Sequence, residues 1–158
     1  MTDAEVIQRF YAAFAVRDAE TMASCYAADV VFTDPAFGQL RGERARDMWR
    51  MLCRAGKDLE VTASGIEAAD GRGSAHWEAD YTFSATKRKV HNVVDARFEL
   101  RDGLIVKHTD VFDFGAWAAQ AFGPVGAVLG RTPVLPFVMQ RLANRQLDGF
   151  QKRSHGSG

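Results

Sequence analysis

Three successive segments in the second half of the chain alternate apolar and polar residues, and they constrain the fold more than any other feature. They cover residues 75–85, 90–100 and 106–112. Lys87-Arg88-Lys89 reads as a solvated hairpin end, and Asp102-Gly103 is a strong turn signal. Alternation with a period of two residues is typical of strands that bury one face. Connections as short as these join strands that are antiparallel neighbours. The pattern therefore predicts an antiparallel meander whose apolar face must be covered.

The N-terminal part of the chain supplies the cover. Thr2 and Glu5 form a capping box, and apolar residues follow at helical spacing as far as Phe14. Two further helices are expected over about residues 19–26 and between Gly42 and Gly56, with short strands at 30–32 and 59–68 and a turn at 70–73. Helices placed on one face of an antiparallel sheet define the α+β class.

The last part of the chain, from Trp117 to Phe150, is apolar, then punctuated by Gly and Pro, then amphipathic. We expect a helical extension over residues 116–153 that packs over a sheet edge or over the mouth of a site. Residues 1–153 are predicted to form one domain, as 158 residues favour. Residues 154–158, with His155 among them, resemble an expression-tag remnant and are set aside.

Composition limits the expected binding partners and the expected cellular compartment. Twenty basic and twenty acidic side chains cancel, so no net field attracts nucleic acid or an anionic membrane, and a small apolar molecule is the expected partner. Two isolated cysteines, Cys25 and Cys53, fit a reduced cytoplasm. The acidic opening, with Asp3 and Glu5, predicts no signal peptide.

Acid–base chemistry is indicated at two places. His108 and Asp110 lie two residues apart on one face of a strand, between Val106 and Phe112. Asp34 follows a short apolar run and precedes a proline. A titratable group in an apolar site can act as a general base or acid. The structural alternatives are an Asp-Pro turn for Asp34 and a mutually satisfied buried pair for His108 and Asp110.

The order of these elements resembles the nuclear-transport-factor-2-like superfamily, and within it the SnoaL-like polyketide cyclases and the ketosteroid-isomerase-like proteins. The resemblance covers roughly residues 3–115 and is carried by residues 6–14, 32–42 and 96–114. It implies a cone, in which a curved antiparallel sheet wraps around a pocket closed by helices. It also implies homodimers that pair their sheets.

The resemblance also bears on the site. Asp34 matches the general-base position of the ketosteroid isomerases, but Phe10 stands where they have an oxyanion-donating tyrosine, with Tyr11 adjacent, and Ala96 stands where they have a protonated aspartate. The familiar steroid isomerisation is therefore not expected. SnoaL-like cyclases use a pocket aspartate helped by His or Asn, which His108 and Asp110 match better.

A third activity of the superfamily, epoxide hydrolysis, uses an Asp–Arg–Asp set. Asp95 and Arg97 are on the opposite strand face from Phe98, so this set is not visible.

These observations predict a cofactor-independent isomerase, lyase or aldol-type cyclase acting on a small carbonyl compound, without a metal site. Asp110, His108 and Asp34 are the catalytic candidates, with Asp110 expected to matter more than Asp34 because His108 can charge or orient it. The candidate substrate-binding residues are Asn92, Trp77, Tyr81, Phe98, Phe10, Tyr11, Phe14 and Phe112. A non-catalytic binder of the same fold, or a scaffold engineered for proton-transfer chemistry, remains the alternative, and the substrate is not determined.

Overall fold

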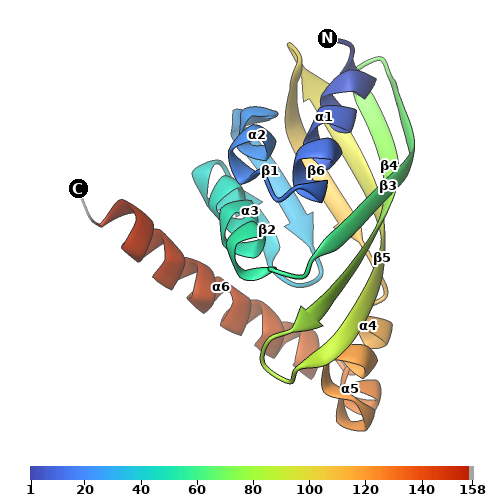
Figure 1. Cartoon of the computed structure of the whole chain (residues 1–158), viewed down its shortest axis with the longest axis vertical. Helices are drawn as coiled ribbons and strands as arrows, with labels where there is room; N and C mark the ends of the chain where they lie inside the picture. Colours follow the sequence, from blue (N-terminus) through green and yellow to red (C-terminus); the bar gives the residue numbers. More distant parts are fainter. Residues whose placement is uncertain (157–158) are drawn as a thin grey trace.

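Six strands form one curved sheet in the computed structural model, which describes residues 1–156 (Figure 1). In sheet order they are β2 (Gly38–Arg41), β1 (Tyr26–Asp34), β6 (Leu104–Val111), β5 (Arg88–Arg101), β4 (Arg72–Phe83) and β3 (Glu60–Ala69). The run from β3 to β6 is the expected antiparallel meander. β1 joins its edge in parallel with β6, so the sheet is mixed at this one pair.

Three helices close the concave face of the sheet: α1 (Asp3–Ala15), α2 (Ala19–Ser24) and α3 (Glu43–Ala55). α1 packs against β3, and α3 packs against β1. Aromatic side chains fill the space between the layers, with Phe10 and Phe32 fully buried and Trp49 nearly so. The expected α+β fold with a curved sheet is therefore confirmed.

Tight turns set the register of the meander. Asp70-Gly71 and Asp102-Gly103 both have positive φ at each residue, with values of 53° and 75° in the first pair and 54° and 76° in the second. This is the two-residue hairpin geometry whose twist matches that of the flanking strands. The first turn is shorter than expected, because β4 already begins at Arg72.

The first strand is where the sequence-based expectation was too short. β1 begins at Tyr26, a residue expected to end a helix, because α2 stops at Ser24 and Tyr26 pairs with Ile105 of β6. β2 was not expected at all. It pairs with β1 across the turn that follows Asp34, and its four residues are too few for a visible alternation.

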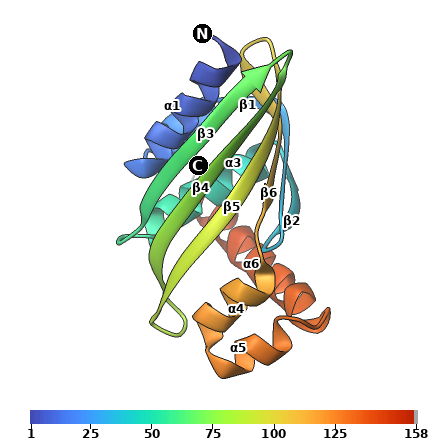
Figure 2. The same ribbon diagram turned by 90° about the vertical axis from the view of Figure 1, so that its right-hand side faces the viewer.

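The C-terminal extension consists of α4 (Phe114–Phe122), α5 (Pro124–Leu129) and α6 (Val134–His155). α4 packs on β5, whereas α6 crosses α3 and buries Leu147 and Phe150 (Figures 1 and 2). Ser154 and His155, set aside as a tag remnant, continue α6, while residues 157–158 lie outside the described part of the chain. Within residues 1–156, no helix combines the length and apolarity needed to cross a bilayer.

Candidate functional site

A chain of hydrogen bonds runs through the middle of the cone. Trp49 Nε1 donates to the hydroxyl of Tyr26 at 2.9 Å, and that hydroxyl lies 2.7 Å from Nδ1 of His108. His108 Nε2 lies 2.8 Å from Oδ1 of Asp110, which also accepts from Trp77 Nε1 at 3.3 Å. His108 is fully buried and Asp110 is 3% exposed, so these bonds form away from solvent.

The partners decide which nitrogen of His108 carries the proton. Tyr26 accepts from Trp49, which leaves its own proton free for Nδ1 of His108. Nε2 then carries the remaining proton and donates it to the carboxylate of Asp110. A neutral imidazole satisfies every partner, whereas a charged one would leave the Tyr26 proton without an acceptor. Both nitrogens are thus engaged, so the role open to His108 is to orient Asp110.

Asp34 is brought beside this chain by the parallel pairing of β1 and β6. Phe32 pairs with His108 and Thr33 with Thr109, so Asp34 follows in register with Asp110, on the same face. Oδ1 of Asp34 accepts from the backbone N–H groups of Ala36 and Phe37, at 3.0 and 2.6 Å. Asp34 therefore both stabilises the Asp-Pro turn through its side chain and lies near Asp110.

The two carboxylates differ in their surroundings. Asp34 is only partly exposed, and desolvation, followed by the charge of Asp110, raises its pKa to about 7, against the lowering effect of the two backbone bonds. Asp110 receives two side-chain N–H bonds, from His108 and from Trp77. Within residues 1–156, Oδ2 of Asp110 accepts no hydrogen bond.

Tyr11 presents an unpaired hydroxyl to the same interior. Its oxygen is the one buried side-chain polar atom without a hydrogen-bond partner among the described residues. Its ring packs against Trp77 and Phe98, with centroid distances of 6.4 and 6.1 Å. Burial, and next the charge of Asp110, raises the pKa of Tyr11 well above its usual range, so the hydroxyl remains a donor. Buried polar groups are normally paired, so this hydroxyl is an exception that leaves one donor unused.

The other expected binding residues divide into two groups. Phe10, Phe14, Trp77 and Phe98 are buried around the hydrogen-bonded chain, and the Phe98 ring lies 4.3 Å from that of His108. Tyr81, Asn92 and Phe112 are partly exposed, towards the end of the sheet that α4 covers. Trp117 of α4 donates to the hydroxyl of Tyr81 at 2.7 Å. Of the candidate residues, only Asp34 and this second group are partly exposed to solvent.

The sequence interpretation missed Tyr26, Trp49 and Trp117, whose side chains hydrogen-bond to His108, Tyr26 and Tyr81, respectively. Tyr26 and Trp49 were assigned to helices, and nothing local to either shows that it reaches His108. The β1–β6 pairing was the missing information, because it places Tyr26 and Phe32 next to the strand that carries His108.

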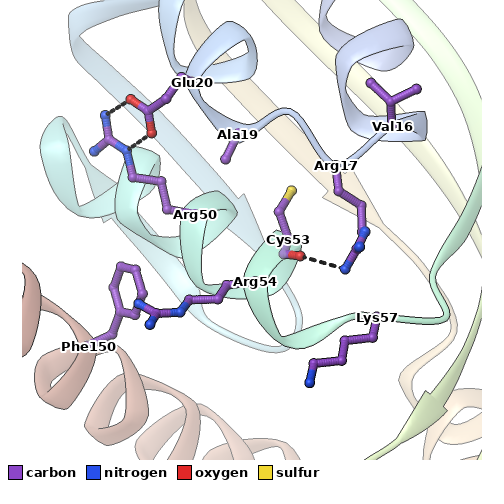
Figure 3. Close-up of a pocket in the computed structure, with 9 residues that line it drawn as sticks. All are labelled: Val16, Arg17, Ala19, Glu20, Arg50, Cys53, Arg54, Lys57 and Phe150. Carbon is purple, nitrogen blue, oxygen red and sulfur yellow. Dashed lines mark hydrogen bonds and ion pairs between the residues drawn. The ribbon is translucent and has the colours of Figure 1, made fainter.

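A surface groove of about 730 Å³ lies outside the cone, between the α1–α2 connection, α3 and α6 (Figure 3). Its lining includes Arg54 and Lys57, together with Phe150 of α6. Arg50 in the same wall is held by Glu20, and Arg17 donates to the carbonyl of Cys53. Burial raises the pKa of the Cys53 thiol to about 11, so it is not a nucleophile. None of the acid–base candidates lines this groove.

One group of potential metal ligands occurs within residues 1–156: Glu43, Asp47 and His155, whose ligand atoms lie within 4.8 Å of one another. Asp47 is buried and already accepts from Arg50, Gln151 and His155. The group is therefore an ion-pair cluster that joins α3 to α6. Asp95 and Arg97 are exposed on the convex face, as expected, away from the interior.

The chain belongs to the SnoaL-like domain family, whose profile matches residues 7–108. Solved structures show the same fold at low identity. A putative polyketide cyclase from Xanthomonas campestris pv. campestris is 21% identical, with a TM-score of 0.64 over 75% of this chain and 96% of that one. An LEH-like epoxide hydrolase from M. tuberculosis is also 21% identical, with a TM-score of 0.63 over 80% and 95%.

A hypothetical protein from Catenulispora acidiphila, with a ketosteroid-isomerase-like fold and bound trimethylamine, is 16% identical, with a TM-score of 0.66 over 76% and 94%. Among curated proteins no relative matches the chain. The resemblance to the nuclear-transport-factor-2-like, SnoaL-like and ketosteroid-isomerase-like proteins is thus confirmed at the level of family and fold.

Proposed function

We propose that this protein is a cofactor-independent acid–base enzyme, an isomerase, lyase or aldol-type cyclase, that acts on a small apolar carbonyl compound inside the cone. The observation that carries the proposal is the pair Asp34 and Asp110. Desolvation and the charge of Asp110 raise the pKa of Asp34 to about 7, whereas Asp110 accepts bonds from His108 and Trp77, so the two neighbouring carboxyl groups have the different surroundings that an acid and a base require.

Each group has a role in this scheme. Asp110, oriented by His108 and Trp77, removes a proton from the carbon next to the carbonyl through its free Oδ2. The unpaired hydroxyl of Tyr11 donates to the carbonyl oxygen as negative charge develops there. Asp34, with a pKa of about 7, returns a proton to the product carbon. The proton left on Asp110 then passes to Asp34, which restores both groups.

The similar structures support the general class of this function. One is described as a putative polyketide cyclase and another as an LEH-like epoxide hydrolase, so the fold carries enzymes. The Catenulispora protein binds trimethylamine, which supports a small molecule as the ligand. For this chain we propose a homodimer in the cytoplasm, with one domain over residues 1–153.

The test is hydrogen–deuterium exchange at the carbons next to the carbonyl in a panel of apolar ketones, followed by NMR. Asp110→Asn keeps the shape of the side chain but removes the base, so the exchange rate should fall by about 10²–10⁴. His108→Ala should reduce the rate less, because His108 orients the base without touching substrate. Asp80→Asn, on the exposed convex face, is the matched control.

If Asp110→Asn exchanges at the full rate, the base assignment is wrong and moves to Asp34. If no ketone exchanges, yet Asp110→Asn lowers the melting temperature and leaves ligand affinity intact, the pair is structural and the protein is a binder.

A further inference from the structure

The outer side of α6 carries apolar side chains that nothing in the described chain covers. They recur at helical spacing, together with two arginines, and form what we call the α6 stripe: Val134, Phe137, Val138, Arg141, Leu142 and Arg145. The exposed fractions reach 65% for Val134 and 60% for Phe137. The Arg141 guanidinium lies 5.6 Å from the centre of the Phe137 ring. Twelve helical residues give the stripe a length of about 17 Å.

Exposed apolar side chains are concentrated at the end of the molecule that carries the stripe. Seven of the twelve large apolar side chains that are exposed lie between residues 125 and 142, three of them on α5 at the same end of the molecule (Figure 2). The opposite side of α6 is occupied, because Gln140 donates to the carbonyl of Pro35 and Asn144 to that of Phe37. The helix therefore has an inner, docked side and an outer, apolar side.

Charge at this end is one-sided. No acidic residue occurs between residues 114 and 147, whereas Arg131, Arg141 and Arg145 do. All three arginines are exposed, and none forms an ion pair with a described residue. Arg88 of the β4–β5 hairpin adds a further base, since its Nε donates to the carbonyl of Gln120 in α4. Because the whole chain has no net charge, the rest of it is net negative.

We propose that the α6 stripe docks on an anionic phospholipid surface and holds the protein at the membrane without crossing it. Apolar side chains interleaved with arginines on one helix face are the pattern of interfacial helices, which lie in the plane of the headgroups. The acidic remainder of the chain orients the molecule with this end towards the lipid. The zero net charge of the whole chain led to the prediction of no membrane partner, because it conceals this separation of a basic end from an acidic remainder.

A second copy of the chain is the competing occupant. A two-fold contact through the stripe would bring two copies of Arg141 and of Arg145 into one interface, with no acidic side chain in the stripe to compensate for their charge. An anionic lipid surface supplies both the apolar layer and the missing negative charge. The charge pattern therefore favours lipid, and self-association is an outcome of the test.

The experiment is co-sedimentation of the full chain with vesicles of phosphatidylcholine alone and of phosphatidylcholine mixed with phosphatidylglycerol. Binding is expected to the mixed vesicles and to weaken as salt is added. Arg141→Gln with Arg145→Gln should weaken it about 30-fold at low salt, because each base near an anionic surface contributes about fivefold. Phe137→Ser with Leu142→Ser should weaken it by at least about tenfold.

Matched controls come from the exposed sheet face. Leu104→Ser with Val111→Ser removes two exposed apolar side chains, and Arg72→Gln with Arg97→Gln removes two exposed bases. Both controls should bind as the unchanged protein does. Light scattering on the Phe137→Ser, Leu142→Ser variant and on the unchanged protein measures their oligomeric states, and so shows whether a second copy of the chain occupies the stripe.

Absence of binding to the mixed vesicles, equal binding to both kinds, or equal weakening by the controls would overturn the proposal. The proposal would also be overturned if the unchanged protein did not bind vesicles and the stripe variant converted a larger assembly to a monomer.

Discussion

His108 is enclosed on both ring nitrogens, and this enclosure is the most informative arrangement at the scale of single residues. Tyr26 holds Nδ1 and Asp110 holds Nε2, with Trp49 and Trp77 completing the chain at its two ends. Each donor meets an acceptor, so the chain fixes the direction of the Asp110 carboxylate. The Asp110 oxygen that no protein group occupies is left for chemistry.

The first prediction at this scale concerns the tautomer of His108. Nitrogen-15 NMR at neutral pH should show Nε2 protonated and Nδ1 unprotonated. Tyr26→Phe removes the donor to Nδ1 and the acceptor of Trp49, so the preference should weaken and stability should fall by about 1–3 kcal/mol. Tyr81→Phe, which loses only its bond from Trp117, should leave the His108 spectrum unchanged. A protonated Nδ1 in the unchanged protein would contradict this account.

The second prediction is a pH dependence of stability that originates at Asp34. The folded-state pKa is raised to about 7 from an ordinary value of 3.8, so the native state keeps a proton that the unfolded chain loses. This contribution to stability is present at low pH and is lost as the pH rises towards and through 7. A shift of about 3 units corresponds to about 4 kcal/mol at most, and partial exposure of Asp34 reduces it to about 2 kcal/mol.

Asp34→Asn should therefore gain stability over the unchanged protein as the pH rises from 5 to 8, measured by denaturant unfolding at each pH. The amide oxygen can still accept the bonds from Ala36 and Phe37. Asp70→Asn, at an exposed turn, is the control, and a stability difference between Asp34→Asn and the unchanged protein that does not vary with pH would refute the assignment.

At the scale of elements, the parallel contact of β1 with β6 and the docking of α6 shape the site. The first brings Asp34 beside Asp110, and the second fixes the turn after Asp34 through Gln140 and Asn144. Arg44 of α3 anchors α6, with bonds to the side chains of Asp148, Gln151 and Asn144 and to the backbone carbonyl of Asn144. A single residue thus makes four of the hydrogen bonds that tie the extension to the domain.

Arg44→Met should loosen this attachment while keeping much of the side chain's volume. Hydrogen bonds to a charged group are worth about 1.5–3 kcal/mol, so a loss of about 2 kcal/mol is expected for the docking of α6. Hydrogen exchange should show faster exchange in α6 and in the turn after Asp34, but not in β4 or β5. Arg41→Met, whose guanidinium contacts only Gln39, is the matched control. Unchanged protection of α6 would show that Leu147 and Phe150 hold the helix without Arg44.

At the scale of the whole molecule, the convex sheet face is rich in polar pairs. His76 bonds to Glu78 and Asp95, and His91 to Glu78 and Asp80, at distances of 2.8 to 3.1 Å. Val93 lies among them and is 46% exposed. A mixed-charge face with an exposed valine suits a two-fold contact between sheets.

Light scattering at micromolar concentration should therefore give twice the chain mass of 17.4 kDa. Val93→Asp adds a charge beside Glu78, Asp80 and Asp95 and should convert the dimer to a monomer, because like charges would oppose each other across the contact. Val16→Asp, at the exposed end of α1, should remain dimeric. If the unchanged protein is a monomer, the proposed dimer is wrong.

The sequence by itself determined the features that depend on neighbours along the chain. Alternation placed His108, Asp110, Trp77 and Phe98 on one face, Asp-Gly pairs marked the turns, and the Asp34-Pro35 step marked the end of a strand. A side chain's face and a turn's geometry follow from the few residues around them, so a local pattern suffices.

Only the tertiary structure decided which strand lies against β6 and which side chains meet His108. The partners Tyr26 and Trp49 are 82 and 59 positions away from it, and their own neighbours are equally compatible with a simple buried helix. The part of the chain between β1 and β6 includes α3, β3, β4 and β5, so their parallel pairing joins segments that are far apart in the sequence. No local periodicity indicates such a contact. Desolvation, and after it the charge of Asp110 that this contact brings near, raises the pKa of Asp34 to about 7, so the folded structure was needed to reveal this property.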